Sequence, residues 1–332
     1  MEEHSRPPVF VARRIPEPGL QSVRDATQAD LWEDELPPPR DELLRRVAGK
    51  HGILTLLTDR VDDELLDAAG PDLRVVSNYA VGFDNVDVPA CTSRRIPVGN
   101  TPSVLTETTA DLAFALLMAA ARRIPEGYDY VRAGQWKTWG PMLLLGPDVH
   151  HATLGIVGFG RIGREMARRA SGFEMTVLYH DTTQATTEDE SELRARYAEL
   201  DELFAASDFI SLHTNLTDET RGMLNGAAFA RMKPTAIVIN TSRGPVIDHA
   251  ALHDALRDGA IGGAALDVTD PEPLPPDHPL LSLPNCLVVP HIASASHVTR
   301  ARMAEMAAAN LLHGLRGERL PTPVNPEVYE QK

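Results

Sequence analysis

One glycine-rich turn limits the folds open to this chain more than any other feature. The run "GFGRIG" (158–163) follows the apolar segment "TLGIV" (153–157) and opens the helical pattern "RIGREMARRA" (161–170). In a dinucleotide-binding unit the first glycine permits a tight turn, the second lets a pyrophosphate approach the backbone, and the third lets the helix pack on the strand. The sequence therefore predicts a Rossmann-type unit whose helix start binds a pyrophosphate.

Short β-rich runs alternate with helical patterns along most of the chain, which is typical of α/β folds built on parallel sheets. We expect strands near 9–12, 52–57, 73–76 and 96–98, a long helix at 108–123, further strands from 153 onward and a last helix at 297–316. The prediction is α/β, with two doubly wound parallel-sheet domains. The chain returns to the first domain at its end, so the predicted boundaries are 1–100 plus 290–332 for one domain and 101–289 for the other.

Length and charge narrow the classes of function. The chain has 332 residues, enough for two domains, and its 43% hydrophobic and 24% charged residues are normal for a globular protein. A net charge of −15 argues against nucleic-acid or membrane-surface binding, since both favour basic patches. An anionic substrate stays open, because a single pocket can be positive on an acidic protein.

The cysteines and the N-terminus favour a cytoplasmic location. Cys91 and Cys286 cannot supply a disulfide framework, and neither has metal-ligand spacing. The first ten residues contain no apolar signal-peptide core, and the most apolar stretch, 108–123, is too short to cross a bilayer. We interpret His150–His151 as a solvated linker and the pair His249/His253 as a polar helix face, so no metal site is predicted.

The residue after the next strand indicates which dinucleotide binds. Asp181 ends the segment "MTVLYHD" (175–181), where a carboxylate can accept both ribose hydroxyls and would repel a 2′-phosphate. The following run "TTQATT" (182–187) lacks an arginine that would favour such a phosphate. We therefore predict NAD(H) in preference to NADP(H).

Four residues suited to acid–base chemistry follow strands later in the chain. They are Arg243 in "NTSRGPVID", Asp267 and Glu272 in "ALDVTDPEP", and His291 in "VVPHIASAS". Ligands bind beyond the carboxyl ends of strands in open parallel sheets, so we expect these side chains in one pocket beside the cofactor. A histidine can give a proton near neutral pH, a nearby carboxylate stabilises its charged form, and a guanidinium matches a substrate carboxylate. The set suits the reduction of a 2-oxo acid.

The same segments resemble the D-isomer-specific 2-hydroxyacid dehydrogenase family over nearly the whole chain. The matching motifs are "SNYAVGFDNVDV" (77–88), "NTPSVLTETTADLAFALLMAAARR" (100–123), "LGIVGFGRIG" (154–163), "SDFISLHTNLTDETRGMLN" (207–225), "INTSRGPVID" (239–248), "ALDVTDPEP" (265–273) and "PHIASA" (290–295). So many motifs in the same order are highly specific.

The resemblance implies a flavodoxin-like substrate domain and a Rossmann NAD-binding domain, with the active site in the cleft between them. It implies that Arg243, Glu272 and His291 are catalytic, with His291 as general acid/base. It also implies that backbone amides around Ala80, Val81 and Gly82 hold the substrate carboxylate. The expected cofactor contacts are Thr106, Gly158, Phe159, Gly160, Arg161, Ile162, Gly163, Asp181, His213, Thr214, Asn215, Thr241, Ser242, Arg243, Asp267 and His291.

Within the family, the run "QWKTWGPMLLLG" (135–146) looks most like the glyoxylate/hydroxypyruvate reductase branch. There the segment belongs to a dimerisation arm, about 124–150 in this chain. Trp139 matches a tryptophan that borders the partner's substrate pocket in that branch. The resemblance thus implies a homodimer that uses NADH to reduce glyoxylate or hydroxypyruvate to the D-2-hydroxy acid.

Other functions of the same fold are less favoured. A phosphoglycerate dehydrogenase-like enzyme, or another D-2-hydroxyacid dehydrogenase, is the main alternative. Phosphite dehydrogenases carry lysine where Val81 stands, and formate dehydrogenases carry glutamine where Glu272 stands, which disfavours both. A non-enzymatic, NAD-sensing scaffold of the corepressor type is disfavoured because no segment resembles a partner-recruiting tail.

Overall fold

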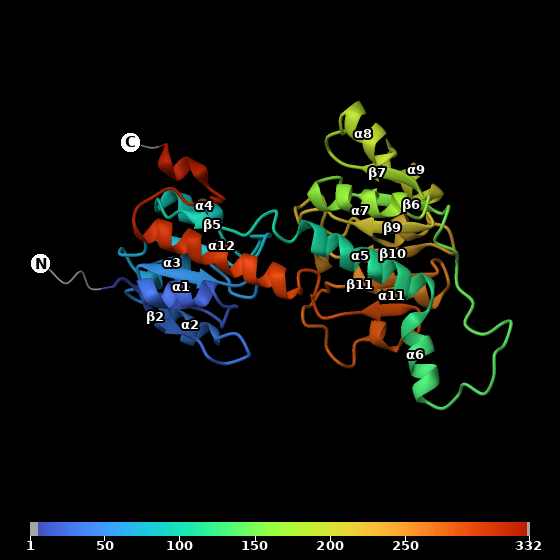
Figure 1. The fold of residues 1–332 in the computed structure, drawn as a ribbon, viewed down its shortest axis with the longest axis horizontal. Coiled ribbons are helices and arrows are strands. Elements are labelled where there is room, and N and C mark those ends of the chain that lie inside the picture. The colour runs from blue at the N-terminus through green and yellow to red at the C-terminus, as the bar shows by residue number, and fades with distance from the viewer. Residues whose placement is uncertain (1–5, 331–332) are drawn as a thin grey trace, which may run out of the picture. The chain divides into compact units, whose positions relative to one another are not determined.

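A computed structural model describes residues 6–330 of the chain. It divides into two compact units, each with its own sheet and core (Figure 1). The first unit consists of the residues up to Leu105 together with those from Ala295 onward. The second unit runs from Thr106 to Ser294.

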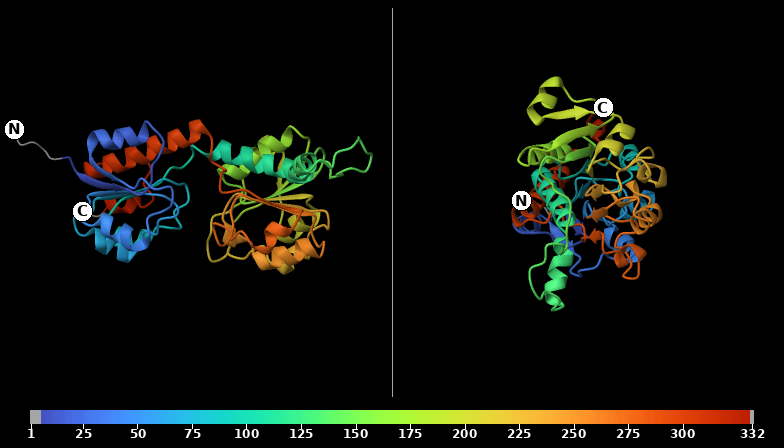
Figure 2. Two further views of the ribbon diagram at one scale, coloured as in Figure 1. Left: turned by 90° about the horizontal axis from the view of Figure 1, so that it is seen from below. Right: turned by 90° about the vertical axis from the view of Figure 1, so that its right-hand side faces the viewer.

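The first unit is built on a five-stranded parallel sheet with the flavodoxin-like order β2-β1-β3-β4-β5. Helices α1 and α12 pack on one face, and α2, α3 and α4 share a core on the other (Figure 2). The strands are β1 (Pro8–Val11), β2 (Gln28–Leu31), β3 (Gly52–Thr55), β4 (Val75–Asn78) and β5 (Val98–Gly99). The helices are α1 (Gly19–Ala26), α2 (Arg40–Val47), α3 (Asp63–Ala69), α4 (Val88–Ser93), α12 (His297–Leu315) and the 3₁₀ turn η3 (Pro326–Tyr329).

The second unit is built on a seven-stranded parallel sheet with the order β12-β11-β10-β9-β6-β7-β8. Its strands are β6 (Thr153–Val157), β7 (Thr176–His180), β8 (Ala195–Tyr197), β9 (Phe209–Leu212), β10 (Ile237–Asn240), β11 (Gly263–Leu266) and β12 (Cys286–Val288). Its helices are α5 (Thr106–Ala121), α6 (Ile124–Arg132), α7 (Arg161–Ser171), α8 (Thr187–Leu193), α9 (Leu200–Ala206), α10 (Gly226–Phe229) and α11 (His249–Arg257), with 3₁₀ turns η1 (Gly244–Val246) and η2 (Pro279–Ser282).

Two apolar layers hold the second sheet. Side chains of α5 and α7, such as Leu117 and Met166, form one core with the strands, and those of α9 and α11, such as Phe204 and Leu252, form the other. Strands β9, β10 and β11 have four residues each, and all of them are buried, as expected of strands covered on both faces. Strand order reverses between the neighbours β6 and β9, and such a reversal is where ligands bind in doubly wound sheets. The prediction of two doubly wound α/β sheets is confirmed.

Several local expectations differ from the structure. Strands β2 and β8 were not expected, because each is a short, largely uncovered edge strand without a run of apolar residues. His249 is buried at the start of α11, so the interpretation of a polar face is wrong for that residue.

Within residues 6–330 no helix is long and apolar enough to cross a membrane, and no cluster of three or more His, Cys, Asp or Glu side chains could hold a metal ion.

Candidate active site

The glycine turn after β6 has the close packing that its residues require. Gly158 has φ +93°, and its N–H donates to the carbonyl of His180 at 2.8 Å. A Cβ on Gly158 would lie 2.6 Å from the carbonyl of His213, at the end of the neighbouring strand β9. A Cβ on Gly163 would lie 2.2 Å from the oxygen of Gly158. No side chain fits at either position, so the turn holds α7 tightly against the sheet.

The same turn fits a dinucleotide. At Gly160 a Cβ would meet no atom within 4 Å, and no side chain caps the start of α7. The N–H groups of Arg161 and Ile162 therefore begin a helix whose positive end suits a phosphate. Among the described residues, the hydroxyls of Thr214 and Thr241 are buried without a hydrogen-bond partner. Thr214 lies two residues after β9 and Thr241 directly after β10, so these buried hydroxyls lie at the carboxyl ends of two neighbouring strands.

Asp181 links the end of β7 to the glycine turn. Its Oδ2 accepts the N–H of Phe159 at 2.6 Å, and its Oδ1 accepts the hydroxyl of Thr182 at 3.2 Å. Arg164, on α7, donates to the carbonyl of Phe159 and pairs with Asp189 at 2.6 Å. The turn thus presents a carboxylate, and its neighbouring arginine already has an anionic partner.

His213 is a neutral side chain at the end of β9. Burial lowers the pKa of His213 to about 4, so the imidazole is uncharged near neutral pH. Its Nε2 lies 2.9 Å from the hydroxyl of Ser211. Asn215, two residues further on, is exposed at the start of the next loop.

The turn that carries Arg243 is organised by the last residue of β10. The Oδ1 of buried Asn240 accepts both the N–H and the hydroxyl of Ser242, at 2.9 and 2.8 Å. Its Nδ2 donates to the carbonyl of Arg243 at 2.9 Å. The Arg243 guanidinium donates to the carbonyl of Ser242. This role of Asn240 has no signal in the sequence beyond a polar residue at a strand end.

Glu272 and His291 form a hydrogen-bonded pair. Oε1 of Glu272 lies 2.5 Å from Nδ1 of His291, and its Oε2 accepts the N–H of Thr269 at 3.3 Å. Burial opposes ionisation of Glu272, but the hydrogen bond to His291 and the charges of His291 and Arg243 outweigh it, so the pKa of Glu272 lies below its usual value. The structure therefore brings Glu272 and His291 together, with the charge of Arg243 close enough to act on Glu272.

Asp267 holds the turn on which His291 lies. His291 has φ +52°, which is uncommon for a residue with a side chain. The carboxylate of Asp267 accepts the N–H groups of Ile292 and Ala293 at 2.6 and 2.9 Å, and its carbonyl accepts the N–H of His291 at 2.9 Å. Burial raises the pKa of Asp267, although these amides favour its charged form. Both oxygens are engaged, so Asp267 acts on the His291 turn, a link that the sequence did not reveal.

The remaining expected residues lie outside the loops that follow β6, β7, β9, β10, β11 and β12. Thr106 is the first residue of α5, and Trp139 lies in the segment after α6 with 78% of its surface exposed. Ala80, Val81 and Gly82 form a loop after β4 in the first unit.

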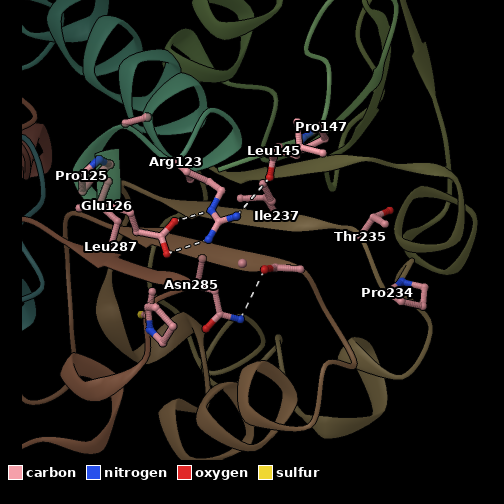
Figure 3. A pocket seen from close by; sticks show the side chains of 18 residues that line it. Arg123, Pro125, Glu126, Leu145, Pro147, Pro234, Thr235, Ile237, Asn285 and Leu287 are labelled. Carbon is pink, nitrogen blue, oxygen red and sulfur yellow. Dashed lines mark hydrogen bonds and ion pairs between the residues drawn. The ribbon is translucent and has the colours of Figure 1, made fainter. Parts of the chain in front are cut away.

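A cavity of about 580 Å³ lies at the opposite edge of the second sheet, where β10, β11 and β12 begin (Figure 3). The Arg123 guanidinium forms a double ion pair with Glu126 over it and also donates to the carbonyl of Leu145. The charge of Arg123 is therefore neutralised, and most of the remaining lining is apolar. The predicted site residues are not among those that line this cavity.

Comparison with known proteins identifies the family. Residues 114–293 match the model of the NAD binding domain of D-isomer specific 2-hydroxyacid dehydrogenases. The chain is 54% identical to the glyoxylate reductase of Korarchaeum cryptofilum over 98% of both chains. It is 46% identical to the human glyoxylate reductase/hydroxypyruvate reductase over 95% of this chain and 96% of that protein. The chain belongs to the D-isomer-specific 2-hydroxyacid dehydrogenase family.

Solved structures agree with this membership of the 2-hydroxyacid dehydrogenases. A Thermus thermophilus protein superposes with a TM-score of 0.90 at 47% identity, covering 96% of this chain and 99% of that one. An NADPH-dependent glyoxylate/hydroxypyruvate reductase from Sinorhizobium meliloti, in complex with NADP and malonate, has a TM-score of 0.84 at 34% identity, covering 97% and 98%. The family therefore establishes a nicotinamide cofactor for this dehydrogenase, while its structural relatives include one that uses NADPH.

Proposed function

We propose that this dehydrogenase reduces a small 2-oxo acid, glyoxylate or hydroxypyruvate, to the D-2-hydroxy acid with NADH. The observation that carries the proposal is the hydrogen bond between Glu272 and His291 beside the charge of Arg243. Its support from the comparisons is the group of relatives named glyoxylate reductase, matched over nearly their whole length.

Each member of this set has a separate task. His291 holds a proton on Nε2 and delivers it to the oxygen of the substrate carbonyl, as a general acid. Glu272 accepts from Nδ1, which fixes the orientation of the ring and leaves Nε2 to face the substrate. Arg243 supplies a planar cation for the substrate carboxylate or carbonyl oxygen. The bound cofactor supplies the hydride.

The preference for NADH rests on Asp181 and Arg164. A carboxylate at the end of β7 accepts ribose hydroxyls and repels a 2′-phosphate. Arg164, which could otherwise attract that phosphate, is paired with Asp189. The cofactor would be held by the glycine turn after β6 and by Thr214 and Thr241, whose buried hydroxyls follow β9 and β10.

We propose a homodimer joined through the arm, residues 124–150. More than half of the exposed large apolar side chains in the described chain lie between Ile124 and Leu145. Trp136 and Met142 have 61% and 78% of their surfaces exposed. Such a concentration favours a protein interface, and a second copy would also bring Trp139 to its partner's substrate. Light scattering tests this: a mass of one 36.2 kDa chain at micromolar concentration would contradict it.

The compartment is also a proposal. Both cysteines are free thiols, and Cys91 is buried. Two unpaired cysteines suit a reducing compartment, so we place the protein in the cytoplasm.

One experiment tests the function. Purified protein is assayed with NADH and with NADPH against glyoxylate, hydroxypyruvate, pyruvate and 3-phosphohydroxypyruvate. We expect the highest kcat/KM for glyoxylate or hydroxypyruvate with NADH. A preference for 3-phosphohydroxypyruvate would favour the phosphoglycerate dehydrogenase alternative, and no turnover of any acid would favour a non-enzymatic scaffold.

A further inference from the structure

The loop after β4 in the first unit has three consecutive carbonyls that are all engaged by protein donors. The Ala80 carbonyl accepts the N–H of Thr101 at 2.8 Å. The Val81 carbonyl accepts Nδ2 of Asn100 at 2.8 Å, and the Gly82 carbonyl accepts Nδ2 of Asn78 at 3.1 Å. The loop is therefore fixed by its carbonyl side.

The opposite side of the loop consists of amide groups. A trans peptide unit is planar, so its N–H points away from its C=O. The bond from Asn100 to the Val81 carbonyl thus sets the direction of the Gly82 N–H, and Thr101 sets that of the Val81 N–H. Within residues 6–330 neither amide donates to a protein acceptor, and Val81 and Gly82 are both partly exposed. Successive N–H groups of this kind form an anion-binding concavity.

Asn100 is itself held from the C-terminal segment. Its carbonyl accepts Nδ2 of Asn310, on α12, at 2.9 Å and the hydroxyl of Thr322 at 2.7 Å. Asn310 is fully buried, and a Cβ on Gly99 would lie 2.6 Å from its side chain. A continuous set of hydrogen bonds therefore runs from Thr322 and Asn310 through Asn100 to the Val81 carbonyl.

We propose that Asn100 is a positioning residue for substrate binding. It aims the Gly82 N–H at the substrate carboxylate, and Asn310 and Thr322 hold Asn100 in place. The last segment of the chain is thereby coupled to substrate affinity. This inference rests on the proposed function only in taking the ligand of the amides to be a 2-oxo acid carboxylate.

The first variant is Asn100→Asp, which keeps the side-chain shape, removes the Nδ2 donor and places a carboxylate against the Val81 carbonyl. We expect KM for glyoxylate to rise about tenfold, the factor that corresponds to one net hydrogen bond. KM for NADH should stay at the wild-type value. Binding of oxamate, an unreactive carboxylate, is measured by calorimetry on the NADH complex, and its Kd should rise by the same factor.

A second pair of variants, at Thr322, tests the hydrogen bonds by which the C-terminal segment holds Asn100. Thr322→Val removes the hydroxyl that donates to Asn100 and should raise both constants about threefold, less than the direct change because Asn310 still donates. Thr322→Ser keeps the hydroxyl and should leave both constants unchanged. Asn325→Ala serves as a stability control. This buried residue bonds to Val98 and Ile96 in the same unit but not to the loop, so it should lower Tm without raising KM.

The outcomes separate the two proposals. Suppose that the wild-type protein reduces glyoxylate and that Asn100→Asp and Thr322→Val both leave KM for glyoxylate and Kd for oxamate unchanged. That result would overturn the positioning role of Asn100 and leave the proposed function intact. Weaker oxamate binding in the variants of a protein that reduces no 2-oxo acid would support the positioning role and overturn the proposed function. A wild-type protein that neither reduces these acids nor binds oxamate would overturn both.

Discussion

A Cβ atom on Gly244 would lie 2.0 Å from the carbonyl oxygen of Thr269. The loops that follow β10 and β11 are therefore in backbone contact. Arg243 precedes this glycine, and the N–H of Thr269 donates to Glu272. The contact explains how a guanidinium from one strand end and a carboxylate from the next come close enough for the charge of Arg243 to lower the pKa of Glu272.

Gly244→Ala should separate these loops. The added methyl group cannot fit beside the Thr269 carbonyl, so the loop carrying Glu272 must shift. A displacement of about 1 Å at catalytic groups costs roughly a hundredfold in rate, and we expect that loss in kcat. The control is Gly226→Ala, where a Cβ meets no atom within 4 Å. Equal activity of the two variants would refute the requirement for close approach.

Asp267→Asn should disturb the His291 turn. An asparagine retains one acceptor oxygen, so one of the two amides of Ile292 and Ala293 loses its partner. We expect kcat to fall by about tenfold to a hundredfold, while the Kd for NADH, measured by fluorescence, changes by less than about threefold. A large rise in the Kd for NADH with unchanged kcat would instead make Asp267 a direct cofactor contact.

The Glu272–His291 pair should control both rate and stability. His291→Ala should lower kcat by about 10²–10⁴-fold without weakening NADH binding, because the proton donor is lost.

The pKa of Glu272 is lower in the folded protein than in the unfolded chain. Its stabilising contribution is therefore present above pH 4.5 and lost as pH falls through the folded value. The Tm difference between wild type and Glu272→Gln should accordingly close on acidification; a difference that widens below pH 4.5 would contradict the pairing.

Asp181→Ala should weaken the preference for NADH. Without the carboxylate, the 2′-phosphate is no longer repelled, and we expect the ratio of kcat/KM for NADH over NADPH to fall about tenfold or more. Adding Asp189→Asn releases Arg164 from its ion pair and should shift the ratio further toward NADPH. Glu188→Gln, an exposed neighbour of equal charge, should leave the ratio unchanged. If Glu188→Gln lowered the ratio of kcat/KM by a similar factor, the preference for NADH would follow from general surface charge and not from Asp181.

Asp59→Asn should stabilise the protein at neutral pH. Burial raises the pKa of Asp59 to about 6, which the bond from the Leu56 N–H and the Arg13 charge only partly offset. The folded pKa of Asp59 lies above its unfolded one, so the contribution of this group to stability is fully present below about pH 4 and is lost as pH rises through 6. Denaturant unfolding should show the variant more stable by up to about 3 kcal/mol at pH 8, with little difference at pH 4. A gap independent of pH would contradict this.

The sequence alone was sufficient for the architecture and for the turn GFGRIG. Both depend on local chemistry: the apolar runs of buried parallel strands, and glycines at positions where a side chain would collide with His213 or with the turn itself. The edge strands β2 and β8 escaped prediction because a short strand exposed at a sheet edge needs no apolar run. Their pairing partners, not their own residues, make them strands.

The candidate residues could be selected from the sequence because polar groups after parallel strands collect at one edge of a sheet. The residues that hold these candidate residues in place could not be selected from the sequence. Asp267 binds amides 25 and 26 positions away, and Asn310 binds Asn100 across 210 positions. Only the tertiary structure decides such contacts, because a hydrogen bond depends on distances of about 3 Å that no residue type or spacing determines across separate strands.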